Sequence, residues 1–199
     1  MFVKTVSNPS EEERNHFDHD GFYPGIITGI EARSNSNDDY DLFVTVYVSN
    51  GYITKESKLC CPNIYSKNGK MGFKRFCRTM LNGIYEWDYE DNIEEEWNYA
   101  CQNVSFTDFI QRRVDIEGYC LDDLPCGYIT TDGIAPMSEL SDKEIEEFDS
   151  LFEGAEIVYK LNSSQKILDY MHEVLCDDTD CSNNAFWDSI YPLPNTNQT

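Results

Sequence analysis

Short segments in which apolar and polar residues alternate occupy much of the first two thirds of the chain. In residues 42–48, four aliphatic residues alternate with Phe43, Thr45 and Tyr47. Because successive side chains of a β-strand point to opposite faces, this spacing predicts a strand with one buried face. An Asn-Gly pair at residues 50–51 predicts the hairpin turn that follows. Similar spacing predicts four more strands, at residues 22–33, 52–61, 112–120 and 127–135.

Other segments repeat their apolar residues every three or four positions, which is the spacing of an amphipathic helix. Residues 69–84 do so with lysine and arginine on the opposite side, and residues 86–103 form a shorter, more acidic version. The Ser-Asp-Lys-Glu at residues 141–144 is a capping box, which predicts the start of a helix. Residues 167–175 predict a last helix.

The order strand, strand, strand, helix, strand, strand is the connectivity of the oligonucleotide-binding (OB) barrel. We therefore expect an α+β protein: a five-stranded, OB-like antiparallel barrel with a helix between strands 3 and 4, plus appended C-terminal helices. The expected parts are an acidic N-terminal arm, the barrel domain, a helical C-terminal extension and a polar tail, at residues 1–20, 21–138, 139–176 and 177–199.

Several stretches of this pattern resemble the phage-encoded single-stranded-DNA-binding proteins of the OB fold. They are residues 21–26 (GFYPGI), the alternating segment 42–48, residues 74–81 (KRFCRTML), and residues 109–117 (FIQRRVDIE) with the Ile-Ala-Pro at 134–136. The resemblance covers about residues 20–140. It implies a non-catalytic protein that binds single-stranded DNA in replication or recombination, without a cofactor, in the cytoplasm of a host cell.

The charge of the chain restricts how it could bind DNA. Its 37 acidic and 15 basic residues give a formal net charge of −22, so the molecule as a whole repels a nucleic-acid backbone. Seven of the basic residues lie in residues 51–80, where Glu56 is the only acid. Either a local basic face binds a strand, or the acidic surface binds a basic protein.

The sequence contains no pattern that predicts a membrane segment, a secretory signal or a cysteine metal site. No run of about 18 apolar residues is present, and the N-terminus lacks the apolar core of a secretory signal, so we expect no membrane segment. The eight cysteines include no Cys-x-x-Cys pair. In a reducing compartment they are best explained as small buried apolar residues, without metal and without disulfides.

An OB barrel usually binds a strand on the outer face of its second and third strands, with aromatic rings against bases and cations near phosphates. The alternation turns Phe43 and Tyr47 outward from the second strand, because the aliphatic residues between them face the core. The predicted nucleic-acid-binding residues are Phe43, Tyr47, Tyr52, Lys55, Lys58 and Arg113. Alternatively, these aromatic residues pack beneath the C-terminal helices.

A different hypothesis assigns the function to the acidic surface. Carboxylates spaced along helices can imitate the phosphates of DNA and occupy the groove of a basic protein. The chain would then be an acidic, phage-encoded inhibitor that blocks a basic nucleic-acid-handling defence enzyme, such as a CRISPR nuclease. Two acidic segments could do this, residues 88–96 and residues 142–156. The expected contacts lie in the first segment: Asp88, Asp91, Glu94, Glu95 and Glu96. The simpler alternative is that these carboxylates only face solvent or pair with the basic helix at residues 69–84.

A catalytic hypothesis rests on three residues. Asp41, Glu56 and Lys58 match the arrangement of metal-dependent nucleases, in which two carboxylates hold Mg²⁺ and a lysine positions water. Such a match arises easily by chance in a chain this rich in acids. We therefore expect no enzyme activity, and keep a Mg²⁺ nuclease as the third hypothesis.

Overall fold

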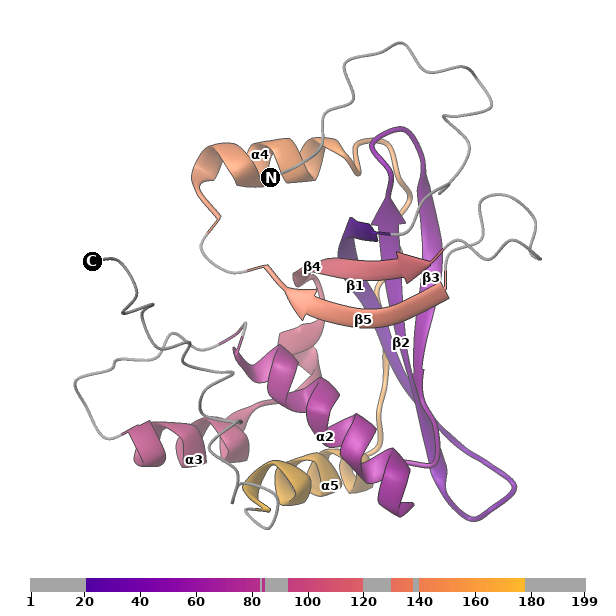
Figure 1. Ribbon diagram of the computed structural model, residues 1–199, viewed down its shortest axis with the longest axis vertical. Helices are drawn as coiled ribbons and strands as arrows, with labels where there is room; N and C mark the ends of the chain where they lie inside the picture. The colour runs from indigo at the N-terminus through magenta and orange to yellow at the C-terminus, as the bar shows by residue number, and fades with distance from the viewer. Residues whose placement is uncertain (1–20, 83, 85–92, 120–129, 138–139, 178–199) are drawn as a thin grey trace, which may run out of the picture.

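One sheet with helices beside it makes up the described part of the computed structural model, which covers residues 21–82, 84, 93–119, 130–137 and 140–177. The sheet has six strands, and four α-helices accompany it (Figure 1). The predicted α+β class is therefore confirmed. None of the helices among these residues is both long enough and apolar enough to cross a membrane.

Five strands lie in the spatial order β3-β2-β1-β4-β5, and each is antiparallel to its neighbour. They are β1 (Gly21–Ser34), β2 (Tyr40–Ser49), β3 (Thr54–Cys61), β4 (Arg113–Tyr119) and β5 (Thr130–Pro136). All five coincide with segments that the alternation predicted, within a few residues at their ends. The sixth strand, β6 (Lys160–Asn162), was not predicted; it pairs in parallel with the part of β1 that β4 leaves unpaired.

The sheet does not close into the predicted barrel. Its path ends at β3 and at β5, which are each hydrogen-bonded to a single neighbouring strand. The helix α2 (Lys67–Asn82) contacts both edge strands and covers the gap between them. Cα atoms of β3 and β5 come within 8 Å of each other, but the two strands form no ladder, so the sheet stays open at this seam.

The described helices fall within or close to the predicted ranges, and residues 86–92 of the predicted 86–103 helix lie outside the described residues. In addition to α2, they are α3 (Ile93–Asn103), a short 3₁₀ helix η1 (Phe106–Phe109), α4 (Asp142–Ser150) and α5 (Gln165–Cys176). The expected helix between strands 3 and 4 is α2. The capping box of α4 is formed as predicted, because the Ser141 hydroxyl accepts from the Glu144 amide and the Glu144 carboxylate accepts from the Ser141 amide.

The core lies between the inner face of the sheet and the helices α2, α3 and α5, which pack on that side (Figure 1). The aliphatic residues of β2 are fully buried there, with Phe73, Met80 and Met171 among their helical neighbours in the core cluster. At the other end of the sheet, α4 buries Phe148, outside this cluster. The prediction that the aliphatic residues of this strand face the core is thus confirmed.

The basic side of α2 is held by the end of α5. Lys70 forms an ion pair of 2.6 Å with Asp177, and Lys74, which is only 4% exposed, donates to the Asp177 carbonyl at 2.5 Å. Sequence analysis did not foresee this partner. These two lysines join the end of α5 to α2, so they belong to the packing of the helices and not to an anion-binding surface.

Candidate nucleic-acid interface

The outer face of β2 and β3 carries three of the predicted binding residues. The aliphatic residues of β2 are fully buried, whereas Phe43 and Tyr47 are half-buried on the opposite face. Tyr47 lies opposite Glu56 of β3, and Thr45 lies opposite Lys58. Residues directly opposite each other in an antiparallel pair share a face. Phe43, Tyr47 and Lys58 are therefore brought together as predicted.

Lys55 and Tyr52 do not belong to this face of the ladder. Lys55 lies opposite the buried Val48, on the inner side of the sheet, and not on the face that Phe43, Tyr47 and Lys58 share. The physical reason is the two-residue period of a strand: Lys55 and Lys58 are three positions apart and must point to opposite sides. Tyr52 precedes β3, in the turn after β2, where it is 44% exposed.

Arg113 lies on the outer face but is already engaged. It is opposite Ile26, which is in turn opposite Tyr47. Its guanidinium donates to both carboxylate oxygens of Asp149 at 2.9 to 3.1 Å and lies 5.5 Å from the centre of the Phe148 ring. Arg113 therefore anchors α4 to the sheet. Among the described residues, α4 thus covers the outer face at this end, as the alternative arrangement of the C-terminal helices predicted.

Beyond Tyr47, three basic side chains gather around one acid, Glu31. They come from three strands: Arg33 from β1, Lys58 from β3 and Lys160 from β6, and we call them the cationic cluster. Arg33 donates to Glu31 at 2.5 Å and lies 4.9 Å above the Phe43 ring. The pKa of Glu31 is lowered, first by this hydrogen bond and further by the charges of Arg33, Lys58 and Lys160.

The strand register explains how Lys160 reaches this cluster. Lys160 lies beside Gly29 of β1, Gly29 is opposite Thr45, and Thr45 is opposite Lys58, so the four residues form one row across the sheet. A Cβ atom on Gly29 would lie 3.2 Å from Thr45 Cβ and 3.3 Å from the Lys160 carbonyl oxygen. Glycine at this position therefore allows β6 to approach β1.

Sequence reasoning missed Arg33 and Lys160. Arg33 is at the end of a predicted strand, and nothing in the sequence indicates that its side chain would lie over the Phe43 ring. Lys160 is in a strand of three exposed residues, which have no apolar alternation to reveal them. The neighbouring Tyr159 is 43% exposed and was missed for the same reason. The weak available signal was the pair of glycines in β1, since an isolated glycine in a strand often marks a close approach of another backbone.

The proposed nuclease residues are not brought together. Asp41 lies six residues from Tyr47 along β2, and Tyr47 is the partner of Glu56, so about 20 Å of strand separates the two carboxylates. Both would have to lie within about 2.6 Å of one ion. Asp41 instead accepts hydrogen bonds from Asn35 and from the Asn63 amide, and Glu56 pairs with Lys58 at 3.2 Å. Across the described ranges, no three ligating side chains are grouped to hold a metal.

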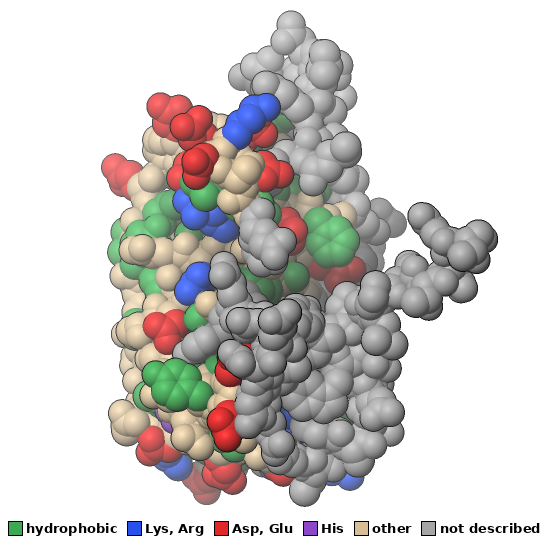
Figure 2. Space-filling view, turned by 90° about the vertical axis from the view of Figure 1, so that its left-hand side faces the viewer, with side chains coloured by type: hydrophobic (Ala, Val, Ile, Leu, Met, Phe, Trp, Pro, Cys, Tyr) green, Lys and Arg blue, Asp and Glu red, His purple; other side chains and the backbone are tan. Residues whose placement is uncertain are grey.

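The residues of the inhibitor hypothesis are only partly described. Asp88 and Asp91 lie outside the described residues, and so does the side chain of Glu94, whose backbone is in α3. Glu95 is exposed and Glu96 is half-buried on the same helix. The second acidic segment is better defined: all seven carboxylates in residues 142–156 are exposed. Figure 2 shows acidic side chains gathered at the end of the molecule where α4 lies.

The cysteines of the described segments are free thiols. Cys61, Cys77 and Cys101 are buried, as expected for small apolar residues, while Cys60 and Cys176 are exposed. Burial raises the pKa of Cys61 to about 12, so this thiol stays protonated and unreactive at neutral pH.

No model of a protein family matches the chain, and a search among curated proteins finds no match either.

Proposed function

We propose that this protein binds single-stranded nucleic acid, with single-stranded DNA as the first ligand to test, on the outer face formed by β6, β1, β2 and β3. No catalytic step is part of the proposal. One observation carries it: the cationic cluster surrounds Glu31 beside the half-buried rings of Phe43 and Tyr47. Rings for bases and cations for phosphates are the two materials that such a surface needs.

Each contact has an expected role. Phe43 and Tyr47 would stack on neighbouring bases, and a stacked base contributes about 1–3 kcal/mol. Arg33, Lys58 and Lys160 would contact the phosphates that follow one another along the strand. Two of them have carboxylate partners at present: Arg33 pairs with Glu31 and Lys58 with Glu56 in exposed ion pairs, which stabilise by about 0–1 kcal/mol. Phosphates can therefore replace these carboxylates at little cost.

The arrangement of the strands supports the same function. The order β3-β2-β1-β4-β5, with a helix between β3 and β4, is compatible with the connectivity of an OB barrel. We regard the sheet as an OB-like barrel opened between β3 and β5. The proposed face is the one on which OB barrels hold oligonucleotides, so it lies where this architecture would place a strand.

The net charge of −22 restricts where the protein could bind a nucleic acid. Binding should depend on the cationic cluster alone, because the rest of the surface repels the strand. Three phosphate contacts to a single strand predict that log K falls against log salt with a slope of about −2. A steeper dependence would require cations that this face does not carry.

The test is a titration of a labelled 15-nucleotide oligo(dT), followed by fluorescence anisotropy at two salt concentrations. We expect Phe43→Ala/Tyr47→Ala to weaken binding by at least about tenfold. Lys160→Gln should make the salt slope less negative by about 0.7. Lys143→Gln, on α4, removes the same charge outside the face and should change neither value. Absence of binding by the unaltered protein at low salt would refute the proposal.

A second function is favoured by a separate observation. Residues 142–156 present seven exposed carboxylates and a single lysine, five of the carboxylates on α4, which Arg113 fixes to the sheet, and two just after it. We propose as the alternative that this acidic segment imitates a phosphate backbone and blocks a basic nucleic-acid-handling enzyme, such as a CRISPR nuclease of a phage host. Competition with DNA for that enzyme is the measurement. A Glu146→Gln/Glu147→Gln/Glu153→Gln variant should compete less well, and unchanged competition would eliminate this alternative.

A further inference from the structure

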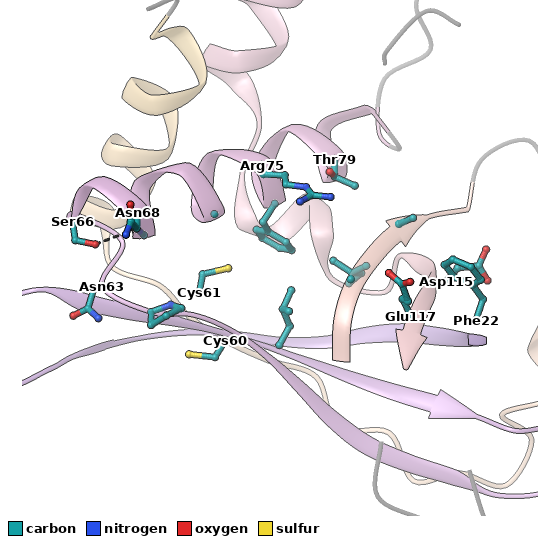
Figure 3. A pocket seen from close by; sticks show the side chains of 18 residues that line it. Phe22, Cys60, Cys61, Asn63, Ser66, Asn68, Arg75, Thr79, Asp115 and Glu117 are labelled. Atoms are coloured by element: carbon teal, nitrogen blue, oxygen red, sulfur yellow. Dashed lines mark hydrogen bonds between the residues drawn. The ribbon is translucent and has the colours of Figure 1, made fainter. Parts of the chain in front are cut away.

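A cavity of about 740 Å³ lies at the open seam of the sheet. Its walls come from α2 between Asn68 and Thr79, from the end of β3, and from the neighbouring strands β4 and β5, with Phe22 of β1 at the rim (Figure 3). Ligand pockets in proteins measure about 300–1,000 Å³. The cavity is thus large enough for a small organic molecule, and its lining includes neither the cationic cluster nor the rings of Phe43 and Tyr47.

An added strand does not fit in the seam, although both of its edges are open. Cα atoms of β3 and β5 approach within 8 Å of each other. A strand inserted between two others needs about 9.5 Å, which is twice the spacing of neighbouring strands. The cavity therefore suits a compact ligand and not a β-strand of a partner.

Opposite charges stand on two walls of the cavity. Arg75 extends into it from α2, while Asp115 and Glu117 extend into it from β4 (Figure 3). Neither the Arg75 side chain nor the Asp115 side chain has a hydrogen bond or an ion pair with another residue in the part of the chain that the structure describes. Asp115 is half-buried, and this loss of water raises its pKa. A cationic partner would stabilise the charged form of a carboxylate in such a place.

Apolar side chains line the cavity as well. Phe22 is 69% exposed and lies directly opposite Glu117 on the neighbouring strand. Phe76 of α2 and Ile134 of β5 line the cavity as well. A matching ligand therefore carries an ammonium group, a carboxylate and apolar groups.

We propose that this cavity binds a short peptide with free termini, with its ammonium group at Asp115 and Glu117 and its carboxylate at Arg75. The side chains of the peptide lie against Phe22 and Phe76. The site is independent of nucleic-acid binding, so neither result decides the other.

Isothermal titration with leucyl-phenylalanine tests the proposal. Its N-acetyl derivative lacks the ammonium group and its C-terminal amide lacks the carboxylate, so each removes one of the proposed contacts. We expect saturable binding of the free dipeptide, and a loss of about tenfold or more for either derivative. No binding of the free dipeptide at about 10 mM would overturn the proposal, and so would equal binding of all three compounds.

Two variants assign the ends of the ligand. Asp115→Asn should weaken the free dipeptide but leave the N-acetyl derivative unchanged, whereas Arg75→Gln should leave the C-terminal amide unchanged. Lys67→Gln on the same helix and Glu95→Gln on α3 make the same charge changes outside the cavity, and should bind like the unaltered protein. If Asp115→Asn and Arg75→Gln both bind the dipeptide normally, the cavity is not the site. Melting temperatures of all variants show that each is folded.

Discussion

At the scale of single residues, two glycines of α2 have opposite surroundings although they are three residues apart. A Cβ atom on Gly69 would lie 2.0 Å from the Asn63 carbonyl oxygen and 2.4 Å from that of Pro62. A Cβ atom on Gly72 would meet nothing within 4 Å. The first glycine is therefore required where the chain turns from β3 into α2, and the second only weakens the helix.

We accordingly expect Gly69→Ala and Gly72→Ala to change stability in opposite directions. Gly72→Ala should raise the free energy of unfolding by about 0.5–1 kcal/mol, because alanine loses less backbone entropy in a helix than glycine. Gly69→Ala should lower it by about 1–3 kcal/mol or more, because backbone atoms must move apart. Urea unfolding of both variants measures the difference. Equal effects would contradict the geometry of this turn.

A second residue-scale prediction concerns Asp115, whose pKa is raised by burial. The folded protein holds this proton more tightly than the unfolded chain. The group therefore favours folding at pH values below its unfolded pKa of about 3.8, and that contribution is lost as the pH rises through the folded pKa. Asp115→Asn should raise the melting temperature at pH 7 and have little effect near pH 3. A lower melting temperature at pH 7 would contradict this prediction, because it would mean that the charged Asp115 carboxylate stabilises the folded protein.

At the scale of elements, α4 is attached to the sheet through few contacts. The Phe148 side chain is fully buried but lies outside the central core cluster, and Arg113 joins the helix to β4 through Asp149. The Ser49 hydroxyl adds a hydrogen bond of 3.2 Å to the Leu151 carbonyl, just after the helix. This end of the molecule should therefore open without the rest.

Phe148→Ala tests that independence. Removing a buried phenylalanine costs about 3–5 kcal/mol where the whole domain depends on it. Here we expect hydrogen exchange to lose protection in residues 142–152, while the amides of β2 keep theirs. Ile145→Ala, at a half-buried position of the same helix, should have a smaller effect. Equal loss of protection in β2 would mean that α4 and the sheet unfold as one unit.

At the scale of the whole molecule, the charge of −22 sets the response to salt. Repulsion between like charges opposes the folded state more than the expanded one, and added salt screens it. We expect the melting temperature at pH 7 to rise between 20 mM and 500 mM sodium chloride. Binding of oligo(dT) should weaken over the same interval, because it depends on attraction at one face. A melting temperature that falls with salt would show that attractive ion pairs outweigh the repulsion.

The features that sequence alone determined are those with a short, local period. Alternation in residues 42–48 correctly separated the buried valines from Phe43 and Tyr47, and the capping box correctly placed the start of α4. The five predicted strands and the helix after the third follow from the same kind of signal. Burying one face of a strand or capping one helix depends on neighbours a few residues away, so the pattern is visible in the chain itself.

Only the tertiary structure decided which distant residues meet. Gly29 beside Lys160, Arg113 with Asp149, and the gap between β3 and β5 depend on how segments far apart in sequence pack. No local period encodes these pairings, since each is chosen by the packing of whole elements around the core. For that reason the rings of the candidate interface could be predicted, while two of its three cations, the engagement of Arg113 and the open seam could not.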